Sequence, residues 1–247
     1  MRKFLVTSIM ALILVCGIEG NDKQPPLLLT TFMTAPLTRI DRTGFYDLIL
    51  IEAFHRAELS VQISHLPTER SITNANLGIT DGEFPRISGL ESLYPNLVMV
   101  SEKLDDFDFT AFTWRSDIKL TNWASCNPYN VAIVRGWKIL EANLADVESL
   151  VRVKNQENLF TLLANQRVDI VIYSRFEGQE IIKQLNLHSI RILDPPLASR
   201  EMFLYLNKKH LLLIPLIKEQ LISMKSDGTY DRIYEKTLRP YMKDTEE

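Results

Sequence analysis

Apolar residues follow two different periods along the chain, one typical of strands and one typical of helices. Leu27–Phe32 is an apolar run bounded by prolines, and Val61–Leu66 alternates apolar with polar residues, so both predict strands. Between them, Gly44–Ala57 has apolar residues at helical spacing, which predicts an amphipathic helix. A short helix is expected over Thr68–Asn76 and a strand over Leu97–Val100. Strands that alternate with helices favour an α/β fold with a mainly parallel sheet.

A second alternation of the same kind covers residues 116–193. It predicts strands at Val131–Val134, Leu150–Val153, Arg167–Tyr173 and Ile190–Leu193. It predicts helices at Trp137–Leu144, Asn155–Gln166 and Glu177–Leu185. Asp194-Pro195-Pro196 then interrupts the pattern, because proline disfavours the interior of a strand. The remaining predicted elements are a tiny strand and turn at Leu77–Gly82 in the first half, a strand at Met202–Leu206, and helices at Leu211–Met224 and Thr229–Thr237.

The segment Asp105–Trp114 alternates polar with aromatic residues and has no helical pattern. We therefore expect an extended connection between the two α/β units. Its aspartates, Asp105, Asp106 and Asp108, also suggest a metal loop, but the segment lacks the glycine and the closing glutamate of a calcium loop. A solvated strand entrance is the favoured interpretation, and we expect no metal and no cofactor.

Residues 1–20 have the layout of a secretory signal peptide. A basic start, Met1-Arg2-Lys3, precedes a nearly continuous apolar run from Phe4 to Ile18, and polar residues follow. The run is shorter than the roughly 20 apolar residues of a membrane span. Cys16 follows an apolar stretch as in a lipoprotein box, but Val15 stands where a small residue is expected. Export is therefore predicted, with a lipid anchor at Cys16 as the less favoured alternative.

Charge and cysteine content narrow the function further. Removal of residues 1–20 leaves 26 Lys and Arg against 30 Asp and Glu, a net charge of −4. Such a chain offers no polybasic patch for nucleic acid. Only Cys126 then remains, so no internal disulfide can form, and we expect this cysteine to be a small buried apolar residue.

A strand, a glycine turn and a helix start follow one another between Val131 and Asn143. Free backbone N–H groups and the positive end of a helix dipole favour an anion in such a turn. Arg135 adds a positive charge beside Gly136 and Trp137. An ordinary strand-to-helix connection is the alternative from these residues alone.

Five motifs in order resemble the periplasmic solute-binding protein family 3, which includes the amino-acid-binding components of ABC importers. They are Thr43–Leu48 (TGFYDL), Leu66–Arg70 (LPTER), Val131–Gly136 (VAIVRG), Gln166–Ile172 (QRVDIVI) and Lys225–Ile233 (KSDGTYDRI). The resemblance covers nearly the whole chain after residue 20. It implies a two-lobed type 2 (Venus-flytrap) fold, in which two crossover strands act as hinges around a ligand cleft.

The resemblance also implies domain boundaries. Lobe 1 is expected to comprise residues 21–110 and 197–247, and lobe 2 residues 111–196. The hinges are expected at 107–114 and 195–206. Relatives carry an aspartate for the ligand's ammonium group where this chain has Ser174, and their carboxylate-binding arginine has no clean equivalent here, although Arg86 is a candidate. These departures argue against a free α-amino acid as ligand.

The candidate ligand-binding residues come from the predicted strand ends and turns, where open α/β sheets place their ligands. They are Phe32, Thr34, Arg70, Arg86, Trp114, Arg135, Gly136, Trp137 and Ser174. The arginines suit a carboxylate because a guanidinium binds it bidentately. Surface ion pairs, local packing or core positions are the alternative roles of these residues.

The expected function is a monomeric periplasmic protein that captures a small organic molecule, with a carboxylate, for the membrane permease of an ABC-type importer. A ligand-sensing domain for a membrane sensor is the alternative. An enzyme is disfavoured, because no GxSxG, HExxH or paired-carboxylate arrangement is present.

Overall fold

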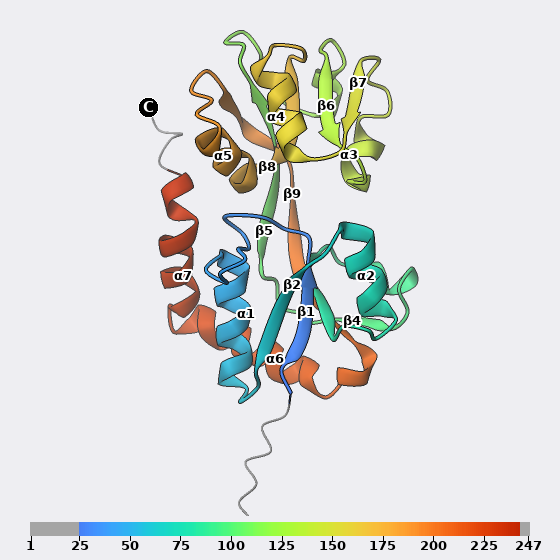
Figure 1. Ribbon diagram of the computed structural model, residues 1–247, viewed down its shortest axis with the longest axis vertical. Helices are drawn as coiled ribbons and strands as arrows, with labels where there is room; N and C mark the ends of the chain where they lie inside the picture. The colour runs from blue at the N-terminus through green and yellow to red at the C-terminus, as the bar shows by residue number, and fades with distance from the viewer. Residues whose placement is uncertain (1–24, 243–247) are drawn as a thin grey trace, which may run out of the picture.

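The computed structural model describes residues 25–242. The predicted signal peptide and Cys16 lie outside these residues. The described chain forms two α/β lobes stacked along the long axis of the molecule, joined by two long strands (Figure 1). We name the lobes by the strands that build them.

Lobe 1 contains the parallel strands β1 (Leu27–Thr31), β2 (Val61–His65) and β3 (Gly82–Arg86). The short strand β4 (Leu97–Met99) and the second half of β9 (Arg191–Asn207) run antiparallel to each other beside them. The helices of this lobe are α1 (Phe45–Arg56), α2 (Thr68–Asn76), α6 (Leu213–Ser226) and α7 (Thr229–Thr237). Helices α1, α6 and α7 pack together, and α2 covers the other side of the sheet (Figure 1).

Lobe 2 repeats this arrangement with the parallel strands β6 (Val131–Val134), β7 (Leu150–Val153) and β8 (Ile170–Ser174). Its helices are α3 (Lys138–Asn143), α4 (Gln156–Ala164) and α5 (Arg175–Gln184). The 3-10 turns of the molecule are η1 (Leu90–Ser92), η2 (Trp123–Cys126), η3 (Lys208–His210) and η4 (Arg239–Tyr241). In each lobe a central parallel strand, β1 or β6, therefore lies between two parallel neighbours.

Two antiparallel strands cross from one lobe to the other, β5 (Asp105–Thr113) and β9. The predicted interruption of β9 at Asp194-Pro195-Pro196 is wrong, because β9 continues through it for 17 residues. The register of the β5–β9 pair shifts between Phe109 and Ala111, where the prolines lie opposite. An irregularity in the ladder accepts residues that have no N–H to donate.

Of the tiny strand and turn predicted at Leu77–Gly82, the turn is observed, whereas strand β3 starts only at Gly82. Gly78 has a φ of +74°, a conformation that ends helix α2 and suits a turn. Leu77 and Ile79 are left 64% and 65% exposed on either side of it. The apolar residues that suggested a strand thus lie on the surface.

Apolar side chains from both faces of the sheet form the core, with Tyr46, Phe84 and Phe112 among the largest fully buried ones. Cys126 is fully buried and unpaired, which confirms the expectation of a small buried apolar residue. Burial raises the pKa of its thiol to about 11, so the thiol stays protonated at neutral pH. Between residues 25 and 242, no helix has the length and apolar character needed to cross a membrane.

Candidate functional site

A cavity of about 380 Å³ lies between the two lobes, beside the crossover strands. We call it the interlobe cavity. Lobe 1 contributes Phe32 after β1, Thr68 and Ile72 of α2, and Arg86 at the end of β3. Gly136, Trp137 and Ile139 come from lobe 2, and Phe107 and Phe109 come from β5. Residues of both lobes and of a crossover strand therefore share one space.

Aromatic rings dominate the walls of this cavity that lobe 2 and β5 supply. Trp137 stacks on Tyr173, with ring centroids 4.8 Å apart and planes inclined by 21°. Phe107 and Phe109 pack against the same indole, with ring centroids 6.0 and 5.9 Å from that of Trp137. These contacts hold Trp137 in one orientation, which makes it a rigid wall for a flat or apolar ligand.

Arg86 is already paired within lobe 1. Its guanidinium binds the fully buried Glu83 carboxylate, with Nε at 2.9 Å from Oε1, and Nη2 donates to the Thr68 carbonyl at 2.9 Å. The same group lies 4.6 Å from the centre of the Phe32 ring. Burial raises the pKa of Glu83, and the charge of Arg86 opposes that rise. Arg86 therefore lines the cavity as one half of a neutralised pair.

The expected anion turn after β6 is occupied by a side chain of its own helix. The Gly136 N–H donates to Oε1 of Glu141 at 2.9 Å, and Lys138 Nζ lies 3.2 Å from Oε2 of the same carboxylate. Gly136 has a φ of +95°, which only glycine adopts without strain. Arg135 is exposed and does not line the cavity, whereas Gly136 and Trp137 do.

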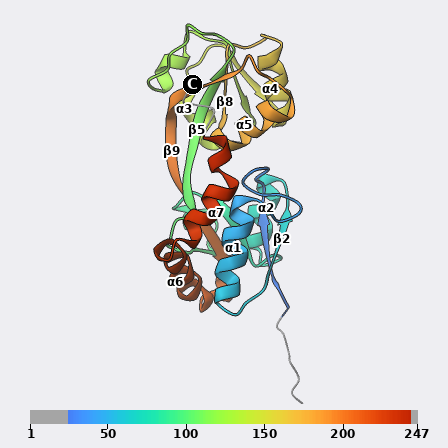
Figure 2. The same cartoon turned by 90° about the vertical axis from the view of Figure 1, so that its left-hand side faces the viewer.

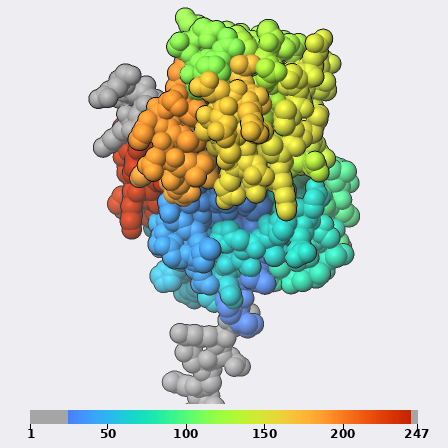
Figure 3. Space-filling view, turned by 45° about the horizontal axis from the view of Figure 1, so that its top comes forward, coloured from blue at the N-terminus to red at the C-terminus, as the bar shows by residue number. Residues whose placement is uncertain are grey.

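A buried contact joins the lobes directly. Oε1 of Glu177, in the first turn of α5, accepts from both N and Oγ1 of Thr34 in lobe 1, each at 2.7 Å. Burial raises the pKa of the Glu177 carboxyl to about 7, although the two bonds from Thr34 lower it. In the space-filling view the orange atoms of the α5 region lie against the blue atoms that follow β1 (Figure 3). We call this contact the interlobe latch.

The other candidate residues lie outside the interlobe cavity. Trp114 packs in lobe 2, and its Nε1 donates to the Val168 carbonyl at 3.0 Å. Ser174 is buried as the N-cap residue of α5, where its side chain makes no capping hydrogen bond. Arg70 is exposed on α2. The structure thus brings Phe32, Arg86, Gly136 and Trp137 together in one space, and Thr34 into the latch.

Glu177 was missed by the sequence reasoning. The available signal was its position three residues after the end of β8. The helix starts at Arg175 and not at Glu177 as predicted, so Glu177 lies in the first turn of α5. An acidic residue there is usually explained by the helix dipole alone. Only the approach of the two lobes shows that Thr34 faces it.

The three aspartates of β5 do not form a metal site. Asp105 is buried and accepts from the Tyr46 hydroxyl at 2.5 Å, and Asp106 pairs with Lys103 at 2.8 Å. Asp108 lies 3.3 Å from the guanidinium of Arg175. Across residues 25–242 no group of three or more His, Cys, Asp or Glu side chains could hold a metal ion.

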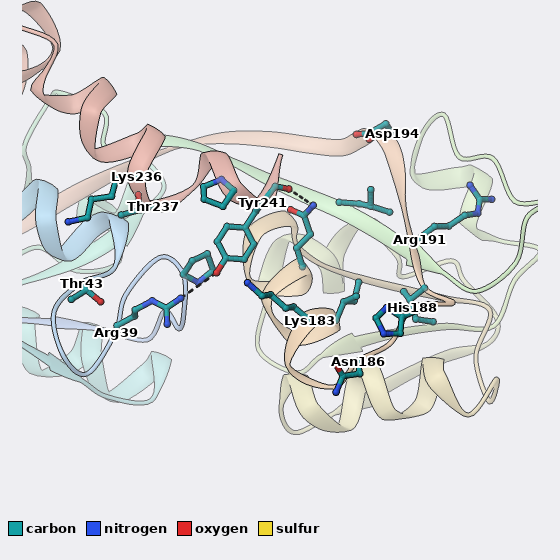
Figure 4. Close-up of a pocket in the computed structure, with 16 residues that line it drawn as sticks. Arg39, Thr43, Lys183, Asn186, His188, Arg191, Asp194, Lys236, Thr237 and Tyr241 are labelled. Carbon is teal, nitrogen blue, oxygen red and sulfur yellow. Dashed lines mark hydrogen bonds between the residues drawn. The ribbon is translucent and has the colours of Figure 1, made fainter. Parts of the chain in front are cut away.

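A second, larger groove of about 980 Å³ lies along α5 and the C-terminal turn η4 (Figure 4). There Tyr241 donates to Oε2 of Glu180 at 2.6 Å, and Gln179 Nε2 donates to the Tyr241 carbonyl at 2.6 Å. Arg39 of lobe 1 donates to the Tyr241 hydroxyl at 3.3 Å. The chain after α7 is thus fastened to lobe 2 on this side. Figure 2 shows α7 running from α6 toward α5.

The fold has many solved counterparts. A histidine kinase sensor domain with similarity to periplasmic binding proteins matches with a TM-score of 0.75 at 16% identity, over 88% of this chain and 97% of that one. The GluR0 ligand-binding core in complex with L-glutamate matches with a TM-score of 0.77 at 12% identity, over 87% and 99%. An ancestral arginine-binding protein bound to arginine matches with a TM-score of 0.73 at 17% identity, over 87% and 99%.

Sequence comparison adds a relative of uncharacterised function. A protein of Shewanella oneidensis is 27% identical over 202 residues, which cover 74% of this chain and 72% of the relative. No family model matches the chain. The structural likeness confirms the fold class that the five motifs implied. The protein has the two-lobed type 2 periplasmic-binding-protein fold, with two crossover strands between its lobes.

Proposed function

We propose that this protein is an extracytoplasmic solute-binding protein, exported by its N-terminal segment, that traps a small organic molecule in the interlobe cavity. The observation that carries the proposal is that both lobes and β5 line a single apolar cavity of about 380 Å³. This volume suits a compact ligand. Hinge motion of β5 and β9 would admit the ligand, and closure would bury it.

The chemistry of the walls favours a ligand with a flat or apolar body. Phe32, Phe107, Phe109 and Trp137 supply ring faces and edges. The two cations that line the cavity already have acidic partners, because Arg86 pairs with Glu83 and Lys138 pairs with Glu141. A free carboxylate on the ligand would have to compete with these acids. We therefore favour an aromatic or aliphatic ligand with a small polar group over a free α-amino acid.

Delivery to an ABC-type permease is the use we propose for the captured ligand. A second use, input to a membrane sensor, is favoured by the likeness to the histidine kinase sensor domain. In either case the protein binds and releases its ligand unchanged, and catalysis is not part of the proposal.

A thermal-shift screen of the protein tests this proposal. The panel would hold amino acids, aromatic and cyclic acids, aliphatic carboxylates and quaternary amines. A ligand present at about 100 times its Kd should stabilise the native state by about 2.7 kcal/mol. If no compound class raises the melting temperature, the solute-binding proposal fails.

The site is tested with a substitution that fills the cavity. Ile139 lines it, so Ile139→Trp should block a ligand and lower its affinity at least tenfold while the unliganded protein stays folded. Ile40, which is 93% exposed, offers the matched control Ile40→Trp. Arg135→Ala should also leave affinity unchanged, because Arg135 does not line the cavity. Equal affinities for wild type and Ile139→Trp would place the ligand elsewhere.

A further inference from the structure

The end of lobe 1 farthest from lobe 2 carries a group of exposed apolar side chains. We call this group the base patch. Its members come from the turn after α2 and from the start of α6, and they are Leu77, Ile79, Leu211, Leu212 and Leu216, which are 64%, 65%, 55%, 86% and 45% exposed. Single exposed apolar residues are ordinary, whereas a gathering of them marks an interaction surface.

The two segments of the base patch are fastened to each other. Lys209 Nζ donates to the Gly78 carbonyl at 3.0 Å, and Gly78 separates Leu77 from Ile79. On α6, Ile217 and Leu221 face the core, which turns Leu216 outward. Leu211 and Leu212 precede the helix and Leu216 lies on its exposed side, so the start of α6 presents apolar surface to solvent.

The base patch lies at the end where the N-terminal segment joins the fold. The carboxylate of Asp81 accepts from the Leu28 N–H at 2.7 Å and pairs with Lys209 at 2.8 Å and His210 at 2.7 Å. The start of β1 and the residues before α6 are therefore held by one side chain. Both ribbon views place the start of β1 and α6 at this same end (Figures 1 and 2). The chain preceding β1 contains the apolar run from Phe4 to Ile18.

The chemistry around the patch suits a lipid headgroup region. Lys208 is exposed beside the leucines and makes no ion pair within residues 25–242. Lys209 and His210 share Asp81, so the net electrostatic attraction is close to that of one lysine. Leucines beside a basic residue are typical of segments that lie in a membrane interface. Apolar contact should therefore dominate the binding, with a smaller contribution from charge.

We propose that the base patch rests on the surface of a phospholipid bilayer. While it is attached, the apolar N-terminal segment would bring this end of lobe 1 to the bilayer. Strand β1 starts at the base and ends next to Phe32, roughly 15 Å away at the strand rise per residue. The interlobe cavity and lobe 2 would thus face the solvent. The inference does not depend on which ligand the cavity takes.

Hydrogen exchange of the full-length chain, with and without vesicles of phosphatidylcholine and phosphatidylglycerol, tests the proposal. Exchange at residues 208–216 should slow about tenfold when vesicles are present, because the leucines would leave water. Ile40 is 93% exposed and lies outside the base patch, so hydrogen exchange in the segment around it should not change. The measurement reports contact of the patch even if residues 1–24 bind the vesicle by themselves.

Variants separate patch contact from tethering. Leu211→Ser combined with Leu212→Ser should remove the vesicle-dependent protection, whereas Ile40→Ser should retain it. Lys208→Gln should reduce the vesicle-dependent protection by a smaller factor, about fivefold or less, since the substitution removes one positive charge. Identical exchange at 208–216 with and without vesicles would overturn the proposal. Protection that survives the double leucine substitution would overturn it as well, because another surface would then make the contact.

Discussion

The turns that follow β1 and β6 occupy equivalent places in the two lobes, yet they satisfy their backbone donors in opposite ways. After β6, the Gly136 N–H is satisfied by Glu141 of the helix that follows it. After β1, the Thr34 N–H and hydroxyl reach Glu177 of the other lobe. The donor of the Gly136 turn is satisfied within lobe 2, whereas the donors of the Thr34 turn need the contact between the two lobes.

Under the proposed hinge motion, the two turns would respond differently to opening of the lobes. The Gly136 turn would keep its hydrogen bond, because donor and acceptor both belong to lobe 2. The Thr34 turn would lose two bonds on opening, and Glu177 would regain water. The latch is therefore expected to add to the link between the lobes that Tyr241 makes with Glu180 and Gln179. Substitutions in the two turns should behave differently.

The largest expected effect is the pH dependence that Glu177 imposes. Its pKa is raised from 4.5 to about 7 in the folded state. Below pH 4.5 the carboxyl is protonated in both the folded and the unfolded state, so it does not lower the free energy of unfolding. As pH rises from about 4.5 to 7, only the unfolded state ionises freely, so the free energy of unfolding falls. The pKa shift corresponds to about 3 kcal/mol of free energy of unfolding, and this stability is fully lost above pH 7.

Glu177→Gln removes this ionisation and leaves an acceptor for Thr34. Denaturant unfolding across pH 4 to pH 8 should show the variant gaining stability relative to wild type by up to about 3 kcal/mol. Asp105 is also buried, with a pKa raised to about 7, and it contributes the same trend to both proteins. The difference between the two curves isolates Glu177. A difference that does not change with pH would contradict the latch.

Thr34→Val should have an intermediate effect. It removes the hydroxyl hydrogen bond to Glu177 and keeps the backbone one. The free energy of unfolding should fall by about 1.5 kcal/mol at pH 8, where the Glu177 acceptor is charged. X-ray scattering should also show a larger open population. Thr43→Val is the matched control, because the Thr43 hydroxyl bonds Asp41 within one exposed loop. Equal losses in both variants would mean that the contact between lobes adds nothing.

Glu141→Ala should have the smallest effect. It frees the Gly136 N–H and lowers the free energy of unfolding by about 0.5 kcal/mol, as expected for a partly exposed cap. Sulfate should then raise the melting temperature of this variant more than that of wild type, because the turn regains a free donor. Glu141→Gln, which keeps an acceptor, is the control. An equal response to sulfate in all three proteins would show that Glu141 does not mask an anion site.

Much of the fold was readable from local patterns. The helix over Thr68–Asn76 and the strands at Val131–Val134 and Leu150–Val153 have the predicted bounds. Helix α4 was expected from Asn155 and begins there with a local cap, since Asn155 accepts from the Asn158 N–H at 2.9 Å. These features depend on residues three or four positions apart, which the sequence displays directly.

The errors arose where distant residues decide the outcome. The prolines of β9 are tolerated because β5 shifts its register beside them. Leu77 and Ile79 resemble a strand but lie exposed on a turn. Gly136 and Trp137 were grouped with Arg135 by adjacency, yet only the first two line the cavity, because neighbouring residues at a turn point in different directions.

The sequence by itself determined two α/β units and most of their elements, because period and capping are local properties. The two-lobed fold class was implied by the resemblance of five ordered motifs to a known family. The tertiary structure alone decided how the charges are used. Arg86 faces Glu83, Gly136 faces Glu141, and Thr34 faces Glu177 from the other lobe. The Thr34–Glu177 pair is separated by 143 positions, and only the packing of the lobes brings its charge and its donors together.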